Sequence, residues 1–185
     1  MKKDILMFSL ILFFALLLYQ GIDIQTVDEY YLLHADDITE DSEVVTLTIR
    51  ADTAVKNFEK LPASLQDERY VPKDGIILPT TEYVLRPKDT VFDILLRATR
   101  HERIPLTYQG AEENRYKSVY IQGINHLYEF SCGPLSGWMY EVNGVFPNYG
   151  VSKYTLKDGD AITFHYTCDL GRDIQKEHVY KEVNR

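Results

Sequence analysis

The two cysteines are the residues of this sequence whose type and spacing point most directly to chemistry. Cys132 and Cys168 are the only cysteines in 185 residues. An even number of cysteines predicts a disulfide if the domain lies in an oxidising compartment. Two free buried thiols and half of a zinc site are the alternatives, although the spacing lacks the CxxC pair typical of zinc ligands. A disulfide would stabilise the fold by about 3 to 4 kcal/mol in the chain-entropy model.

Between the cysteines lies an aromatic loop, residues 143–150, with the sequence NGVFPNYG. Its glycines and proline can hold Phe146 and Tyr149 outward, and Asn148 adds an amide for hydrogen bonding. Such a surface suits a flat, partly polar ligand or a patch on a protein partner. The alternative is that Phe146 and Tyr149 fold back and cap the sheet.

Trp138 is the only tryptophan and is a further candidate ligand platform. Strand alternation places it on the same face as Tyr140 and opposite Met139, which favours packing in the core. The candidate ligand-binding residues are therefore Phe146, Asn148, Tyr149 and Trp138.

Catalytic motifs are absent from the sequence: there is no phosphate-binding loop, metal-ligand cluster, nucleophile motif or recognisable acid–base pair. Glu112 and Glu113 are adjacent in a polar stretch and are expected in a solvated loop. His165 has no neighbouring ligand motif and is expected on the exposed face of a strand. We therefore predict a protein that is not an enzyme and holds no cofactor or metal. Its formal net charge of −8 argues against nucleic acid as a partner.

The elements that must position these residues follow from hydrophobic periodicity. Val45, Leu47 and Ile49 alternate with polar residues, which indicates a half-buried strand. Residues 76–85 are apolar but contain a proline, which indicates an edge strand or a broken hairpin. A helix is predicted after Pro87, with Asp89 or Thr90 as its N-cap and Asp93 completing a capping box. Further strands are predicted at residues 106–108, 118–121, 127–130, 138–142 and 161–167. The fold class is therefore α+β, a sheet with one helix packed on one face.

The N-terminus has the layout of a signal peptide or short signal anchor. Lys2 and Lys3 precede an apolar run from Ile5 to Tyr19. The following residues offer no small-x-small cleavage site, which favours an uncleaved membrane-anchor helix; a cleaved, secreted form is the alternative. With both lysines on the cytoplasmic side, the C-terminal body lies outside the cell.

Several segments of the body resemble a known family. They are VVTLTIRADT, DGIILPT, TVFDILLRAT, YIQGINHLYEF and the stretch from Cys132 to Gly171. In this order they are similar to bacterial extracellular domains that resemble the C-terminal β domain of transcobalamin and intrinsic factor. The resemblance covers residues 44–171 and implies a β-grasp-like arrangement. The expected organisation is a signal anchor or signal peptide at 1–22, an acidic linker at 23–43, a transcobalamin-like domain at 44–171 and a polar tail at 172–185.

The resemblance also implies a function. The animal carriers use the equivalent small domain to cover one face of cobalamin, while a larger helical domain supplies the other. We therefore expect a cell-surface, membrane-anchored binding domain for cobalamin or another corrinoid-like ligand, with a second protein completing the site. The alternative is an extracellular interaction or adhesion domain that contacts an envelope or transporter protein and takes no small molecule.

Overall fold

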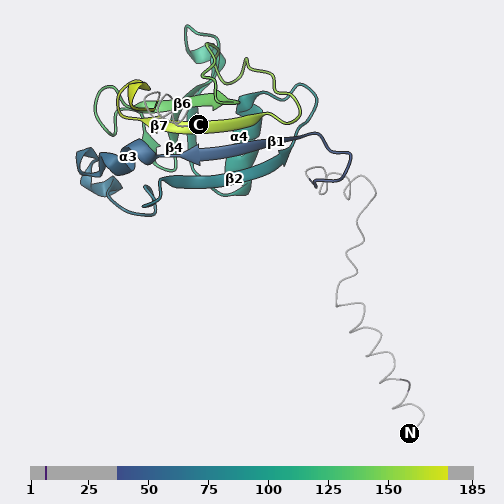
Figure 1. The fold of residues 1–185 in the computed structure, drawn as a ribbon, viewed down its shortest axis with the longest axis horizontal. Helices are drawn as coiled ribbons and strands as arrows, with labels where there is room; N and C mark the ends of the chain where they lie inside the picture. Colours follow the sequence, from purple (N-terminus) through teal and green to yellow (C-terminus); the bar gives the residue numbers. More distant parts are fainter. Residues whose placement is uncertain (1–6, 8–36, 175–185) are drawn as a thin grey trace, which may run out of the picture. The chain divides into compact units, whose positions relative to one another are not determined.

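The structure, a computed structural model, describes Met7 and residues 37–174 (Figure 1). The chain divides into two units, Met1–Asp37 and Ile38–Arg185. The predicted anchor at 1–22, apart from Met7, and residues 23–36 of the predicted linker lie outside the described residues. Among the residues that are described, no helix is long and apolar enough to cross a membrane.

The larger of two sheets has four strands in the order β2-β1-β7-β6 (Figure 1). The central strand β1 runs antiparallel to β2 and parallel to β7, and β7 runs antiparallel to β6. The strands are β1 (Val44–Arg50), β2 (Ile76–Val84), β6 (Gly137–Val142) and β7 (Ala161–Thr167). A first hairpin, a helix and a parallel pairing between first and last strands form the predicted β-grasp-like arrangement.

Alternation explains the two central strands. Val45, Leu47 and Ile49 of β1 are buried, as predicted, and their neighbours are partly exposed. Ile162 and Phe164 of β7 are buried on the same inner face. Strand β2 is an edge strand, as predicted, and continues through its proline with an irregular register against β1. A proline is tolerated there because an edge strand has no ladder partner on one side.

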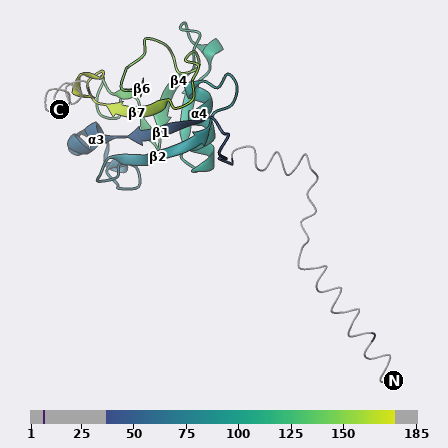
Figure 2. The ribbon, with the colours of Figure 1, turned by 45° about the vertical axis from the view of Figure 1, so that its right-hand side comes forward.

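Helix α4 (Val91–His101) covers the inner face of this sheet (Figures 1 and 2). Thr90 is its N-cap, and the predicted capping box with Asp93 is present. The apolar side chains of α4 and the inner face of the sheet make the main core. Arg97 anchors the helix further, because it pairs with Asp89 at 2.8 Å and donates a hydrogen bond to the Val84 carbonyl at 2.6 Å.

A second sheet has the order β3-β4-β5, a division that the strand pattern does not predict. Strand β4 begins two residues later than expected, because the Val119 N–H donates to the Ser152 hydroxyl instead of a strand partner. Strand β5 ends before Phe130, which has a positive φ of 67° and lies in a turn. The three strands are β3 (Leu106–Gln109), β4 (Tyr120–Ile124) and β5 (Leu127–Tyr128). Short helices complete the described chain: α3 (Asp52–Lys56), η1 (Phe58–Lys60), η2 (Ala63–Leu65) and η3 (Ala111–Glu113).

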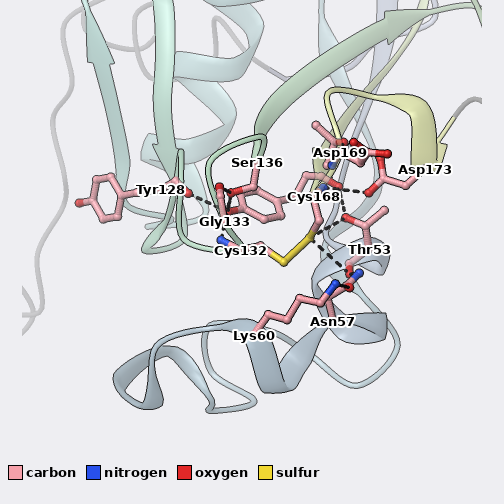
Figure 3. Close-up of a disulfide and its surroundings, with 12 residues drawn as sticks. Thr53, Asn57, Lys60, Tyr128, Cys132, Gly133, Ser136, Cys168, Asp169 and Asp173 are labelled. Atoms are coloured by element: carbon pink, nitrogen blue, oxygen red, sulfur yellow. Dashed lines mark hydrogen bonds between the residues drawn. A yellow bond between two sulfur atoms is a disulfide. The ribbon is translucent and has the colours of Figure 1, made fainter.

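The predicted disulfide between Cys132 and Cys168 is present (Figure 3). It joins the turn before β6 to the residue that follows β7, and the two Cα atoms are 5.5 Å apart. The Cys132 N–H donates to the Ser136 hydroxyl at 3.0 Å, and the Cys168 N–H donates to the Asp173 carboxylate at 2.8 Å. A smaller apolar cluster that includes Leu127 packs around this bridge.

Candidate functional site

The aromatic loop, residues 143–150, sends its two rings to two different surfaces. The Phe146 ring lies beside the imidazole of His165, with ring centroids 6.0 Å apart, on the outer face of the larger sheet. Asn148 and Tyr149 instead line a groove with residues that lead into β4. The sequence predicts Phe146 and Tyr149 on one surface, and the structure separates them.

We call this groove the tyrosine groove. It is a hollow of about 400 Å³ between the loop and the segment before β4. Tyr116 and Tyr149, the most exposed rings in its lining, have 63% and 65% of their surface exposed. The lining consists of Tyr116, Ser118, Val119, Tyr120, Pro147, Asn148, Tyr149, Gly150 and Lys153.

Hydrogen bonds hold the backbone beneath these exposed rings. The Tyr140 hydroxyl donates to the Tyr149 carbonyl at 2.7 Å. On the facing segment, the Lys153 ammonium donates to the Tyr116 carbonyl at 2.9 Å. Each ring is therefore exposed while its own backbone is fixed, which reduces the conformational entropy that a ligand would have to remove on binding.

A close contact between Gly150 and Ser118 brings the two walls of the groove together. A Cβ atom at position 150 would lie 1.9 Å from the Ser118 hydroxyl oxygen. The Ser118 and Ser152 hydroxyls lie 3.0 Å apart and tie the same two segments to each other. Only glycine allows this approach, so the width of the groove depends on Gly150.

The tyrosine hydroxyls give the groove its polar character. The Tyr120 hydroxyl donates to the Glu129 carboxylate at 2.6 Å. Burial, together with the hydrogen bond to Glu129 and its negative charge, raises the pKa of Tyr120 to about 12. The Arg115 guanidinium lies 4.9 Å from the Tyr116 ring centroid and donates to its hydroxyl at 2.7 Å. The groove therefore combines aromatic faces with tyrosine hydroxyls and the ammonium group of Lys153.

Trp138 is half-buried and packs against the core. Its indole N–H donates to the Leu127 carbonyl at 2.8 Å, and its ring meets the Tyr166 ring edge to face at 5.3 Å. The side chain packs against both apolar clusters of the domain. The lining of the tyrosine groove does not include it.

A second hollow, the polar hollow, lies on the outer face of the larger sheet and has a volume of about 280 Å³. Two close polar contacts lie in it. The Arg50 guanidinium forms an ion pair with Asp52 through two contacts of 2.7 Å, and His165 Nε2 lies 3.3 Å from Glu141 Oε1. The lining consists of Thr48, Arg50, Asp52, Thr53, Thr80, Glu141, Thr163, His165, Tyr166 and Ile174.

The strand register explains how the polar hollow forms. Arg50 of β1 is the Cα partner of His165, and Glu141 of β6 is the partner of Thr163. His165 does lie on the outer face, as expected, but its side chain is only 13% exposed. Thr163 and His165 are the polar members of the β7 alternation. Their face is thus visible in the sequence, whereas their enclosure is not.

The charge balance of the polar hollow is set by Arg50. Burial alone would raise the pKa of Asp52, but the hydrogen bonds and positive charge of Arg50 outweigh it and hold that pKa below the usual value. Asp52 is therefore ionised at neutral pH. Among the described residues, no group of three His, Cys, Asp or Glu side chains could hold a metal ion.

Comparison with known proteins gives one family match. Residues 88–168 match the model of a family described as "Domain of unknown function (DUF4430)". The matched region runs from just before α4 to Cys168 and includes both cysteines and the aromatic loop. No curated protein matches the chain.

Several solved structures are similar to the chain, among them the following two. One is a protein from Ruminococcus gnavus ATCC 29149 described as a candidate metal binding protein, with 11% identity and a TM-score of 0.40 over 68% of this chain and 96% of that one. The other is haptocorrin in complex with Cbi, with 10% identity and a TM-score of 0.46 over 72% of this chain. This chain spans 27% of the haptocorrin chain.

Proposed function

We propose that this chain is a non-catalytic binding domain that takes a flat, partly polar small molecule at the tyrosine groove. A corrinoid such as cobalamin is the ligand that we propose first, on the resemblance of residues 44–171 to the small domain of the cobalamin carriers. The observation that carries the proposal is the pair of exposed rings, Tyr116 and Tyr149, on fixed backbone around one hollow.

The chemistry of the groove suits such a ligand. A tyrosine ring offers an apolar face, and its hydroxyl binds polar substituents at the edge of a planar molecule. Asn148 adds an amide that donates and accepts. The hollow of about 400 Å³ is within the range of about 300 to 1,000 Å³ that is usual for small-molecule sites.

The open groove also indicates an incomplete site. Small-molecule sites enclose about 70 to 90% of their ligand, whereas the two principal rings of this groove are more than half exposed. We propose that a second surface completes it, supplied by an envelope or transporter protein or by a second copy of this chain. The isolated domain would then bind weakly, because only one face of the ligand is covered.

A location outside the cell, with attachment to the membrane through the N-terminal segment, belongs to the same proposal. The sequence supports it through Lys2, Lys3 and the apolar run from Ile5 to Tyr19. The disulfide is in keeping with it, since paired cysteines persist mainly in oxidising compartments.

The test is equilibrium dialysis of the full chain, in a mild detergent because of its apolar N-terminal run, against cobalamin and cobinamide. We expect saturable binding that becomes about tenfold weaker in Tyr149→Ala, since an aromatic contact and its buried area contribute on the order of 1.5 to 3 kcal/mol. Val145→Ala is the matched control, because it lies in the same loop, is 65% exposed and does not line the groove.

Two outcomes would contradict this function. Equal binding by Tyr149→Ala and wild type would place the ligand elsewhere. No binding of either corrinoid at high protein concentration, together with a crosslinked envelope protein that Tyr149→Ala loses, would favour the interaction domain without a small molecule.

A further inference from the structure

The polar hollow shares no lining residue with the tyrosine groove. We infer that it is a second binding site, for a neutral carbohydrate: one monosaccharide, or the terminal sugar of a glycan. This inference is independent of the proposed function, because it rests on other residues and another class of ligand.

The charges of the polar hollow favour a neutral ligand. Its cation, Arg50, is bound to Asp52 through two short contacts, and Glu141 pairs with His165. An anionic ligand would face both carboxylates, and a cationic ligand would face the Arg50 guanidinium. Either would have to be desolvated without a free opposite charge, which is costly in a partly buried site. A neutral molecule avoids that cost.

The hydrogen-bonding groups favour hydroxyls on the ligand. Thr48 and Thr80 have their hydroxyl oxygens 2.9 Å apart, and the Thr163 side chain lies on the neighbouring strand. A threonine hydroxyl both donates and accepts, as a sugar hydroxyl does. The Glu141 side chain is 9% exposed and lines the hollow, so its carboxylate can accept a charge-assisted hydrogen bond in a site with little water.

The size and the apolar edge of the hollow favour a single sugar ring. Its volume of about 280 Å³ is slightly below the range of about 300 to 1,000 Å³ for drug-sized ligands, so it suits a ligand of one ring. The Ile174 side chain lines the hollow and supplies apolar surface against which the C–H face of a sugar can pack. The polar side chains come mainly from paired strands, which hold them in fixed positions.

The experiment is titration calorimetry of the full chain in mild detergent with glucose, galactose, mannose and N-acetylglucosamine, preceded by a neutral-glycan array. We expect at least one sugar to bind, and to bind about tenfold more weakly in Thr163→Val, which removes a hydroxyl, and in Glu141→Gln, which replaces a charged acceptor with a neutral one. Thr163→Ser keeps the hydroxyl and should restore most of the affinity.

Thr155→Val is the matched control, because this threonine is exposed and lines neither hollow. Tyr149→Ala should also leave sugar binding unchanged. The inference is overturned if no neutral sugar binds the wild-type chain at millimolar concentration. It is also overturned if a bound sugar has the same affinity for wild type and for folded Glu141→Gln, with folding checked by circular dichroism.

Discussion

The tyrosine groove and the polar hollow differ in which part of the chain is held in place. In the groove, hydrogen bonds hold the backbone while the Tyr116 and Tyr149 rings remain exposed. In the hollow, the side chains themselves are held in place, by the Arg50–Asp52 ion pair, by the contact between His165 and Glu141, and by the strand register. The groove therefore offers exposed aromatic surface to one face of a flat ligand, and the hollow offers fixed hydrogen-bonding positions to a single sugar ring.

The aromatic loop, residues 143–150, reaches both surfaces. The Phe146 ring lies beside His165 on the outer face of the larger sheet. Tyr149 lines the groove, and only Pro147 and Asn148 lie between the two aromatic residues. A short rigid connection thus separates two surfaces without a second element of secondary structure. Variants on either side of Pro147 should therefore affect different ligands.

The largest effect is expected when the disulfide is removed. In Cys132→Ser/Cys168→Ser the free energy of unfolding should fall by about 3 to 4 kcal/mol, because the unfolded chain regains the entropy of an open loop. The Cys168 sulfur contacts the Thr53 carbonyl, and Thr53 lines the polar hollow, so sugar binding should weaken more than corrinoid binding. Urea unfolding measures the first quantity, and dialysis measures the second.

Reductant is the control for that variant: it should destabilise the wild-type chain and leave the double variant unchanged. A loss of less than about 1 kcal/mol would mean that the unfolded chain gains little entropy when the bridge is absent.

A smaller effect, confined to the groove, is expected from Gly150→Ala. The added methyl group overlaps the Ser118 hydroxyl, so the two walls must separate. Overpacking of this kind costs about 1 to 3 kcal/mol, and corrinoid binding should be lost while sugar binding persists. Thermal melts and dialysis measure both effects.

Two variants test whether that contact is the cause. Gly137→Ala is the control, because its added Cβ has its nearest contact at an ordinary 3.9 Å. Gly150→Ala/Ser118→Gly should recover part of the stability. If Ser118→Gly restores no stability to Gly150→Ala, the close contact between residues 150 and 118 does not determine the width of the groove.

Acid should act on the polar hollow before it acts on the groove. The pKa of Asp52 is lowered in the folded state, so its ion pair with Arg50 stabilises the fold fully above about pH 3.8 and loses that contribution as the pH falls through the lower folded pKa. The pair is partly exposed, so Asp52→Asn should cost about 1 kcal/mol or less near neutrality.

Unfolding curves of wild type and Asp52→Asn between pH 6 and pH 2 measure this difference, which should shrink toward acid. Asp169→Asn, in a more exposed pair with Arg172, is the control and should change stability very little. A difference that stays constant to pH 2 would rule out the Arg50 pair as its source.

The smallest expected effect is a change in the ionisation of Tyr120, which lines the groove. The pKa of Tyr120 is raised to about 12 in the folded state. The protonated hydroxyl therefore stabilises the fold fully below about pH 10, and this stabilisation is lost as the pH rises toward 12. Absorbance titration near 295 nm should show a tyrosine that ionises late and disappears in Tyr120→Phe.

Tyr140 provides a second reference point in that titration. Burial, with a smaller contribution from Tyr154, also raises the pKa of Tyr140 to about 12, so Tyr140→Phe should remove a separate late step. If Tyr120→Phe has as many tyrosines that ionise at high pH as the wild type, Tyr120 is not one of the residues with a raised pKa.

Local pattern predicts the central elements well. Strand β1, strand β7 and the capped helix α4 each carry their periodicity or cap within a few residues, and all three are confirmed. The division into two sheets depends on pairing between distant segments, which no local pattern contains. The extent of β5 depends on the backbone of Phe130, a residue type that rarely adopts positive φ.

The candidate site is only partly visible in the sequence for the same reason. Asn148 and Tyr149 stand out because glycine and proline surround them. Tyr116 lies in a polar stretch and Tyr120 in the predicted strand at 118–121, and neither position indicates a binding site. They join the groove through contacts such as Lys153 with the Tyr116 carbonyl. Whether Phe146 and Tyr149 share one surface depends on the path of the loop after Val142, which composition does not determine.

The parallel pairing of β1 with β7 determines when this domain can finish folding. Thr46 is the partner of Ala161, so the first strand made must wait for the last. Until then one edge of β1 is open, and Cys132 has no thiol to pair with. A chain that emerges from its N-terminus therefore remains unfinished, and open to wrong pairings, until nearly all of it has emerged. The fold can therefore close only after both ends of the domain are available for pairing.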